Sequence, residues 1–103
     1  MALTGKQKHY LRSQAHHLRP IFSVGKNGLT ETWLEQLDGA LQHRELIKVN
    51  LQQSADVEVS EVKNFIEDNS AIQVAQTIGR VLVLYLPATE EKYQHYSLEV
   101  AKL

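Results

Sequence analysis

A four-residue motif, Gly25-Lys26-Asn27-Gly28, separates a short apolar segment from a segment with helical periodicity. Glycine lacks a Cβ atom, so a loop that contains it can turn sharply and lie directly against a ligand. Lys26 adds a positive charge at the tip of the loop. A helix that begins near Thr30 would add unpaired N–H groups and the positive end of its dipole. We therefore expect this loop to bind phosphate groups.

Basic side chains recur along the segment that precedes the loop. Lys8, Arg12, His16 and Arg19 are separated by four, four and three residues, which places them along one side of a predicted helix, with Lys6 near its start. The first 30 residues carry five basic and no acidic side chains, whereas residues 31–103 carry six basic and all twelve acidic ones. A helix face of one charge sign is self-repulsive, and an anionic ligand would relieve that repulsion. This charge distribution favours an anionic partner such as nucleic acid.

Catalytic and metal-binding patterns are absent from the sequence. The chain has no cysteine, its five histidines include no H-x-x-x-H pair, and no G-x-S-x-G motif or carboxylate cluster with catalytic spacing occurs. We expect no enzymatic activity, no metal and no cofactor. Only two residues separate the glycines of the loop, which is too short for a nucleotide-binding P-loop but matches the G-x-x-G loop of KH-type domains. Since no apolar run is long enough to span a bilayer or form a signal peptide, we expect a cytoplasmic protein without a membrane partner.

The apolar periodicity predicts an α/β domain with the element order αβαβαββ over residues 1–87, followed by a tail at 88–103. The predicted helices cover residues 4–19, 30–43 and 57–68, and the predicted strands cover residues 21–24, 46–51, 71–78 and 81–85. A turn at Gly79-Arg80 makes the last two strands an antiparallel hairpin, so that the four-stranded sheet is mixed. Polar residues on one side of the first three strands predict helices mainly on the other face. The tail fits either a helical turn or disorder.

Several of these segments together resemble the CRM domain family, and most closely its bacterial stand-alone, YhbY-like RNA-binding members. The likeness extends over about residues 3–87 and rests on the following motifs: Leu3-Thr4-Gly5-Lys6-Gln7, Leu11-Arg12 with Ala15-His16, Pro20, Gly25-Lys26-Asn27-Gly28-Leu29-Thr30-Glu31, Glu45-Leu46-Ile47-Lys48-Val49, and Ile78-Gly79 with Leu84-Tyr85. The chain departs from the family pattern at Leu86, where a basic residue is usual, and the tail matches no motif.

The resemblance implies a fold similar to the C-terminal domain of translation initiation factor 3 and non-catalytic binding of rRNA in precursors of the large ribosomal subunit. The residues expected to contact RNA are Gly25, Lys26, Asn27, Gly28 and Thr30 in and after the loop, and Lys6, Lys8, Arg12, His16 and Arg19 before it. Recognition of backbone shape is expected rather than sequence readout. The alternative is an adaptor that contacts a ribosomal protein or a GTPase through its open sheet face or its tail.

Overall fold

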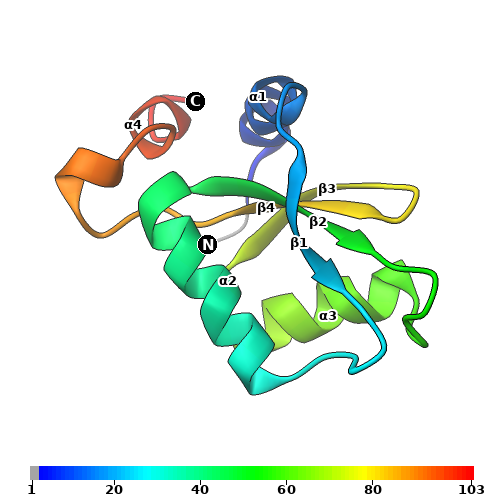
Figure 1. The fold of residues 1–103 in the computed structure, drawn as a ribbon. Helices are drawn as coiled ribbons and strands as arrows, with labels where there is room; N and C mark the ends of the chain where they lie inside the picture. The colour runs from blue at the N-terminus through cyan, green and yellow to red at the C-terminus, as the bar shows by residue number, and fades with distance from the viewer. Residues whose placement is uncertain (1–2) are drawn as a thin grey trace.

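The computed structural model describes residues 3–103 and contains one mixed α/β sheet with its helices (Figure 1). In chain order the elements are α1 (Gly5–Ala15), β1 (Pro20–Val24), α2 (Glu31–Arg44), β2 (Leu46–Leu51), α3 (Val59–Asn69), β3 (Gln73–Ile78), β4 (Val81–Tyr85), the 3₁₀ turn η1 (Glu91–Tyr93) and α4 (Ser97–Val100). The predicted α/β class and the order αβαβαββ up to β4 are confirmed.

The sheet has the strand order β1-β2-β4-β3. β1 pairs in parallel with β2, whereas β4 pairs antiparallel with both β2 and β3, so the predicted mixed sheet and closing hairpin are confirmed. β4 lies inside the sheet because its side chains are apolar in both directions. β1 and β3 form the two edges.

Helices cover both faces of the sheet (Figure 1). The expectation that they lie mainly on one face holds for α2 and α3, which pack with one side of the strands around Leu37, Ile47, Ile66 and Leu84. α1 lies on the other face with the short α4, and a second, smaller core forms there around Leu11. The strand alternation did not reveal this second core, because the residues of α1 that build it lie far from the strands in sequence.

α1 begins as the sequence predicts and ends earlier. Thr4 and Gln7 form a capping box in which each side chain accepts a hydrogen bond from the other residue's backbone N–H. The helix ends at Ala15, and His16 is its C-cap. The prediction that Arg19 continues the helical row is therefore wrong. Arg19 lies in the connection to β1. The turn before it is closed by a hydrogen bond from the N–H of Leu18 to the carbonyl of Ala15.

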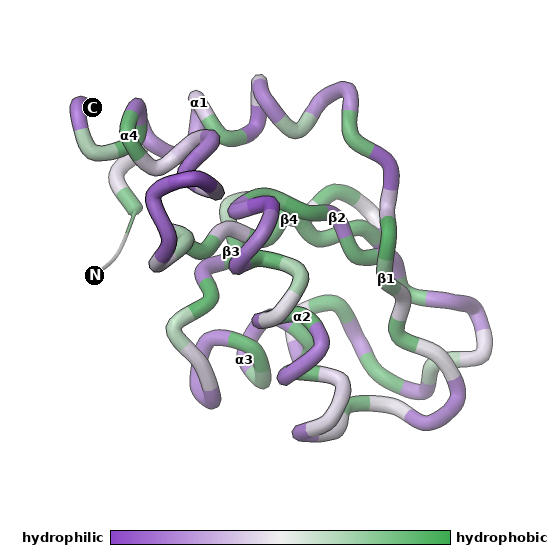
Figure 2. The backbone as a smooth tube through the Cα atoms, turned by 60° about the vertical axis from the view of Figure 1, so that its left-hand side comes forward, coloured by the Kyte–Doolittle hydropathy of each residue, from purple (hydrophilic) through white to green (hydrophobic). Residues whose placement is uncertain are grey.

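The tail is ordered by contacts with the rest of the domain. The side-chain amide of Gln7 donates to the Val100 carbonyl at 3.0 Å, and Val100 and Tyr96 pack with Leu11 of α1. Figure 2 shows the hydrophobic residues of β2 and β4 inside the fold and hydrophilic ones recurring along α1 at its outside. No helix within residues 3–103 combines the length and apolar character that crossing a membrane requires.

Candidate nucleic-acid interface

The G-x-x-G loop at the end of β1 requires a glycine at Gly28 and leaves little room for a side chain at Gly25. The N–H of Gly28 donates to the Gly25 carbonyl at 3.0 Å, which closes a tight turn, and Gly28 has a left-handed φ of 69°. A Cβ atom on Gly25 would lie 2.9 Å from Oε1 of Gln52, at the end of the neighbouring strand. The loop is thus shaped by its turn and by the close approach of Gln52.

This loop borders a hollow at the N-terminus of α2. Of the residues predicted to contact RNA, five line it, together with neighbours from β1, α2 and the end of β2: Gly25, Lys26, Asn27, Gly28 and Thr30, with Ser23, Thr32, Trp33, Gln36 and Gln52. The Thr30 hydroxyl accepts a hydrogen bond from Trp33 N–H at 3.1 Å, so the predicted helix cap forms. Within residues 3–103, nothing accepts a hydrogen bond from the backbone N–H groups of Lys26 and Asn27. These donors are available to an anion.

The basic residues before the loop that are predicted to contact RNA are all exposed, but they lie at separate places on the surface. Arg12 and His16 line a hollow between α1 and the sheet, with His9, Lys48, Gln76 and Ile78 among its other residues. Lys8 borders a separate hollow at the start of β3, beside Lys63 and Glu67 of α3. Lys6 and Arg19 are exposed near the start of α1 and in the connection after it.

The basic side chains of this region are not neutralised by acids. The ion pairs in the described part of the chain join Lys92 with Glu90 and Lys102 with Glu99, all outside the predicted surface. Lys26, Arg12 and the other basic residues predicted as contacts take part in neither. A surface of unpaired cations attracts polyanions, and counterion release then favours their binding.

Sequence reasoning missed two polar residues, Lys48 and Gln52, that line these hollows, and a third, Arg80, that holds the backbone at Gln52. Lys48 of β2 lies in the hollow beside Arg12 and His16. Gln52 borders the loop, and Arg80 in the β3–β4 turn donates through its guanidinium to the Leu51 and Gln52 carbonyls, at 3.3 and 2.8 Å. The alternation within β2 already placed Lys48 on the polar side, but only the pairing of the strands shows which helix and which loop it approaches.

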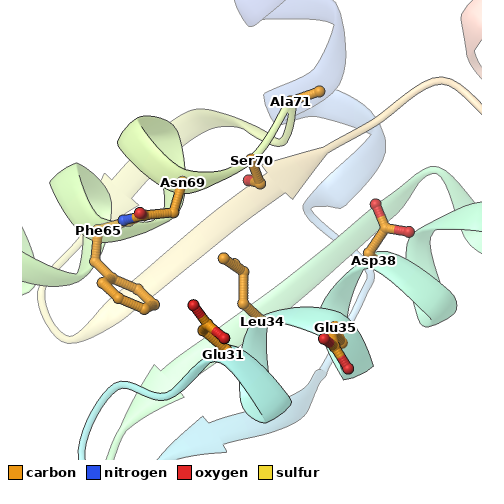
Figure 3. Close-up of a pocket in the computed structure, with 8 residues that line it drawn as sticks. All are labelled: Glu31, Leu34, Glu35, Asp38, Phe65, Asn69, Ser70 and Ala71. Carbon is orange, nitrogen blue, oxygen red and sulfur yellow. The ribbon is translucent and has the colours of Figure 1, made fainter.

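Three acidic residues line a hollow between α2 and α3. Figure 3 shows a hollow between α2 and α3 that is lined by Glu31, Glu35 and Asp38 together with Leu34, Phe65, Asn69, Ser70 and Ala71. Glu31 belongs to the first turn of α2, yet it lines this hollow and not the one at the loop, whose α2 residues are uncharged. The described residues contain no group of three histidines or acids that could hold a metal ion. The acidic residues of the first turns of α2 thus face α3 and not the loop hollow.

Comparison with known proteins gives a consistent result. Residues 3–85 match the CRS1/YhbY (CRM) domain. The chain is 47% identical over 90 residues to the Bacillus subtilis protein named "Probable RNA-binding protein YqeI", covering 87% of this chain and 94% of that protein. It is 46% identical over 94 residues to a Haemophilus influenzae protein named "RNA-binding protein", covering 89% and 93% of the two chains.

A solved structure agrees in fold. The solution structure of a Staphylococcus aureus protein superposes with a TM-score of 0.71 at 40% sequence identity, covering 87% of this chain and 94% of that one. The domain match includes the loop, α1 and all four strands. The chain therefore belongs to the CRS1/YhbY (CRM) domain family.

Proposed function

We propose that this protein is a non-catalytic RNA-binding protein that binds rRNA in precursors of the large ribosomal subunit. The observation that supports it best is the hollow at the G-x-x-G loop, where Lys26, two unpaired backbone N–H groups and the N-terminus of α2 come together. The names of the relatives support RNA as the ligand. The ribosomal target rests on the family resemblance.

In this proposal the loop and α1 grip the RNA backbone. Lys26 and the N–H groups of Lys26 and Asn27 donate to phosphate oxygens, and the dipole of α2 adds to their attraction. Arg12 and His16 extend the polar surface toward the other edge of the sheet, and the acids in Figure 3 line a different hollow from the one at the loop. Backbone contacts position the RNA and do not read its sequence.

The test is a binding titration with an rRNA transcript over a range of salt concentrations. We expect log K to fall linearly with log[salt], at a slope of about −0.7 to −0.9 per phosphate contact. Lys26→Ala and Arg12→Ala should each weaken binding. Each should also make the salt slope shallower by about the amount that one phosphate contact contributes. The matched controls are Lys92→Ala and Arg44→Ala, which remove exposed cations from η1 and from the end of α2. If the loop and α1 variants bound as the wild type does, the proposed surface would be wrong.

The ribosomal target needs a second experiment. Tagged protein from growing cells should sediment with large-subunit precursors, and nuclease treatment should release it. If the protein stayed bound to a ribosomal protein or a GTPase after the RNA had been digested, it would be an adaptor and not an RNA-binding protein.

A further inference from the structure

Part of the α1 face of the sheet is not covered by any helix. Figure 1 shows α1 and α4 above one part of this face, with the β3–β4 hairpin reaching beyond them. One large apolar side chain is accordingly exposed at its edge, that of Ile78 in β3, by 56%. Ile78 stands beside partly exposed polar side chains of the same face, Lys48, Asn50 and Gln76, so this face is open to another molecule.

The strand register arranges this uncovered face in two rows. Lys48 and Gln76 both pair with Val83, which is buried under α1, so these two partly exposed side chains flank it across β4 in the row that borders α1. In the next row toward the loop, Asn50 pairs with Ser23 and with Val81, and Val81 pairs with Ile78. Neighbouring strands lie about 4.8 Å apart and alternate residues about 6.7 Å apart, so the two rows span about 14 by 7 Å.

These rows connect the two parts of the proposed RNA surface. The first row belongs to the hollow under Arg12 and His16. The second reaches the loop, because the Gln52 side chain donates to the Ser23 hydroxyl at 3.0 Å and both residues line the loop hollow. The path from α1 to Lys26 therefore runs over the sheet face.

The chemistry of this face differs from that of the loop. It combines one cation, the amide and hydroxyl groups of Gln76, Asn50 and Ser23, and the exposed apolar side chain of Ile78, and no acid lines the hollow at its α1 end. Amides can hydrogen-bond to base edges, and flat apolar surfaces accept base faces. A duplex keeps its base faces stacked inside and offers mainly its backbone, whereas an unpaired segment exposes them.

From this placement we propose that the uncovered sheet face binds the bases of a few unpaired RNA nucleotides, whose phosphates lie between α1 and the G-x-x-G loop. This inference rests on the proposed function and adds to it a preference for single-stranded RNA. The sheet face contributes base contacts, and the loop and α1 contribute phosphate contacts.

The test compares a 12-nucleotide single-stranded RNA of mixed sequence with the duplex that it forms with its complement. Ile78→Ala and Asn50→Ala should each weaken binding of the single strand by about two- to tenfold, which is what a lost apolar contact or a lost hydrogen bond costs, and leave duplex binding unchanged. Leu98→Ala is the matched control, because Leu98 of α4 is 60% exposed and lies outside this face. Thermal unfolding of each variant checks that the fold is intact. Lys26→Ala should weaken binding of both RNAs.

The outcomes separate the two proposals. If Lys26→Ala weakens binding but the sheet variants bind the single strand as the wild type does, the base-binding face is wrong and the loop assignment stands. If the wild type binds the rRNA transcript but neither 12-nucleotide RNA, the base-binding face is wrong and the proposed function stands. If Ile78→Ala changes the oligomeric state of the RNA-free protein and not its RNA affinity, the face is a protein contact and the inference is wrong. A single strand that carries 4-thiouridine should crosslink to residues 46–52 and 73–81.

Discussion

The carboxylate of Glu45 accepts a 2.6 Å hydrogen bond from the backbone N–H of Tyr96, which lies 51 residues later in the chain. The same carboxylate accepts hydrogen bonds from the N–H groups of Ala88, at 2.7 Å, and Ser97, at 3.0 Å. Glu45 is fully buried and has a left-handed φ of 65°, a conformation that usually requires glycine. Its hydrogen bonds to the tail offset this backbone strain and the burial of its charge.

The first prediction concerns the stability that Glu45 provides. Glu45→Gln leaves only one acceptor oxygen for three N–H donors, and its amide nitrogen would face another donor. We expect the free energy of unfolding to fall by about 1.5–3 kcal/mol, the range for hydrogen bonds to a charged group. Urea denaturation at neutral pH measures it. Glu35→Gln on the exposed side of α2 is the control and should change stability by less than about 0.5 kcal/mol. An equal effect of both substitutions would contradict the role given to Glu45.

The second prediction is a pH dependence of that stability. Burial by itself raises the pKa of Glu45, but the hydrogen bonds that Ser97, Tyr96 and Ala88 donate outweigh it, so its pKa lies below the ordinary value of 4.5. A carboxyl whose pKa is lowered by folding stabilises the fold fully above its unfolded pKa, and this contribution is lost as the pH falls through the folded pKa. The stability difference between wild type and Glu45→Gln should therefore shrink below about pH 4.5. Denaturation curves recorded at neutral and at acidic pH test this, and a constant difference would refute it.

The third prediction concerns the backbone at Gly28. A Cβ atom there would meet nothing within 4 Å, so Gly28→Ala changes only the backbone preference at a φ of 69°. We expect a loss of about 1–2 kcal/mol in the free energy of unfolding, the cost of a left-handed conformation for a residue with a side chain. Gly39→Ala is the matched control, since its Cβ also meets open space but its backbone is helical, and it should stabilise by about 0.5–1 kcal/mol. Thermal unfolding of the two variants shows whether each substitution lowers or raises the stability.

The fourth prediction concerns the contact between Gly25 and Gln52. Gly25→Ala places a Cβ atom 2.9 Å from Gln52 Oε1, so the Gln52 side chain must move and give up its hydrogen bond to Ser23. We expect a loss of about 1 kcal/mol in the free energy of unfolding. In the background of Gln52→Ala the same substitution should cost much less, because the atom it meets is gone. Additive effects in this double-mutant cycle would show that the contact does not constrain the loop.

The fifth prediction uses the single tryptophan of the chain as a reporter. Trp33 lines the loop hollow, and its indole N–H donates to the Ser23 carbonyl at 3.1 Å. RNA that enters the hollow should change the fluorescence of Trp33 with the same midpoint as a separate anisotropy titration of labelled RNA. Free tryptophan amide titrated with the same RNA corrects for absorption by the bases. Unchanged emission at saturating RNA would place the bound RNA away from the loop.

Most of the elements could be predicted from local pattern, and the differences have local causes. The Thr4–Gln7 capping box and the Thr30 cap were read correctly, because each depends on residues three positions apart. The end of α1 was placed too late, at the residue before Pro20. A proline disfavours the helical conformation of the residue before it, so it limits where a helix can end but does not extend the helix up to that point. In this chain the turn at His16 and His17 ends the helix first.

Glu45 illustrates the opposite case. A negatively charged residue at the C-terminus of a helix is unfavourable for the helix dipole, and a non-glycine residue is unfavourable in the left-handed conformation. Local rules therefore argue against Glu45 at this position. Its stabilising partners, Ala88, Tyr96 and Ser97, lie more than 40 residues away in the sequence, in a tail whose structure the sequence left open.

By itself, the amino-acid sequence determined the order of helices and strands, the G-x-x-G loop and the uneven distribution of charge, because each of these is a pattern among neighbouring residues. Tertiary structure alone decided that α1 crosses the face of the sheet opposite α2 and α3, that the tail closes over Glu45, and that Lys48, Asn50 and Gln76 lie between α1 and the loop. The physical reason is that packing and strand register join segments far apart in the chain, and those contacts depend on which apolar surfaces remain to be buried after the local elements have formed.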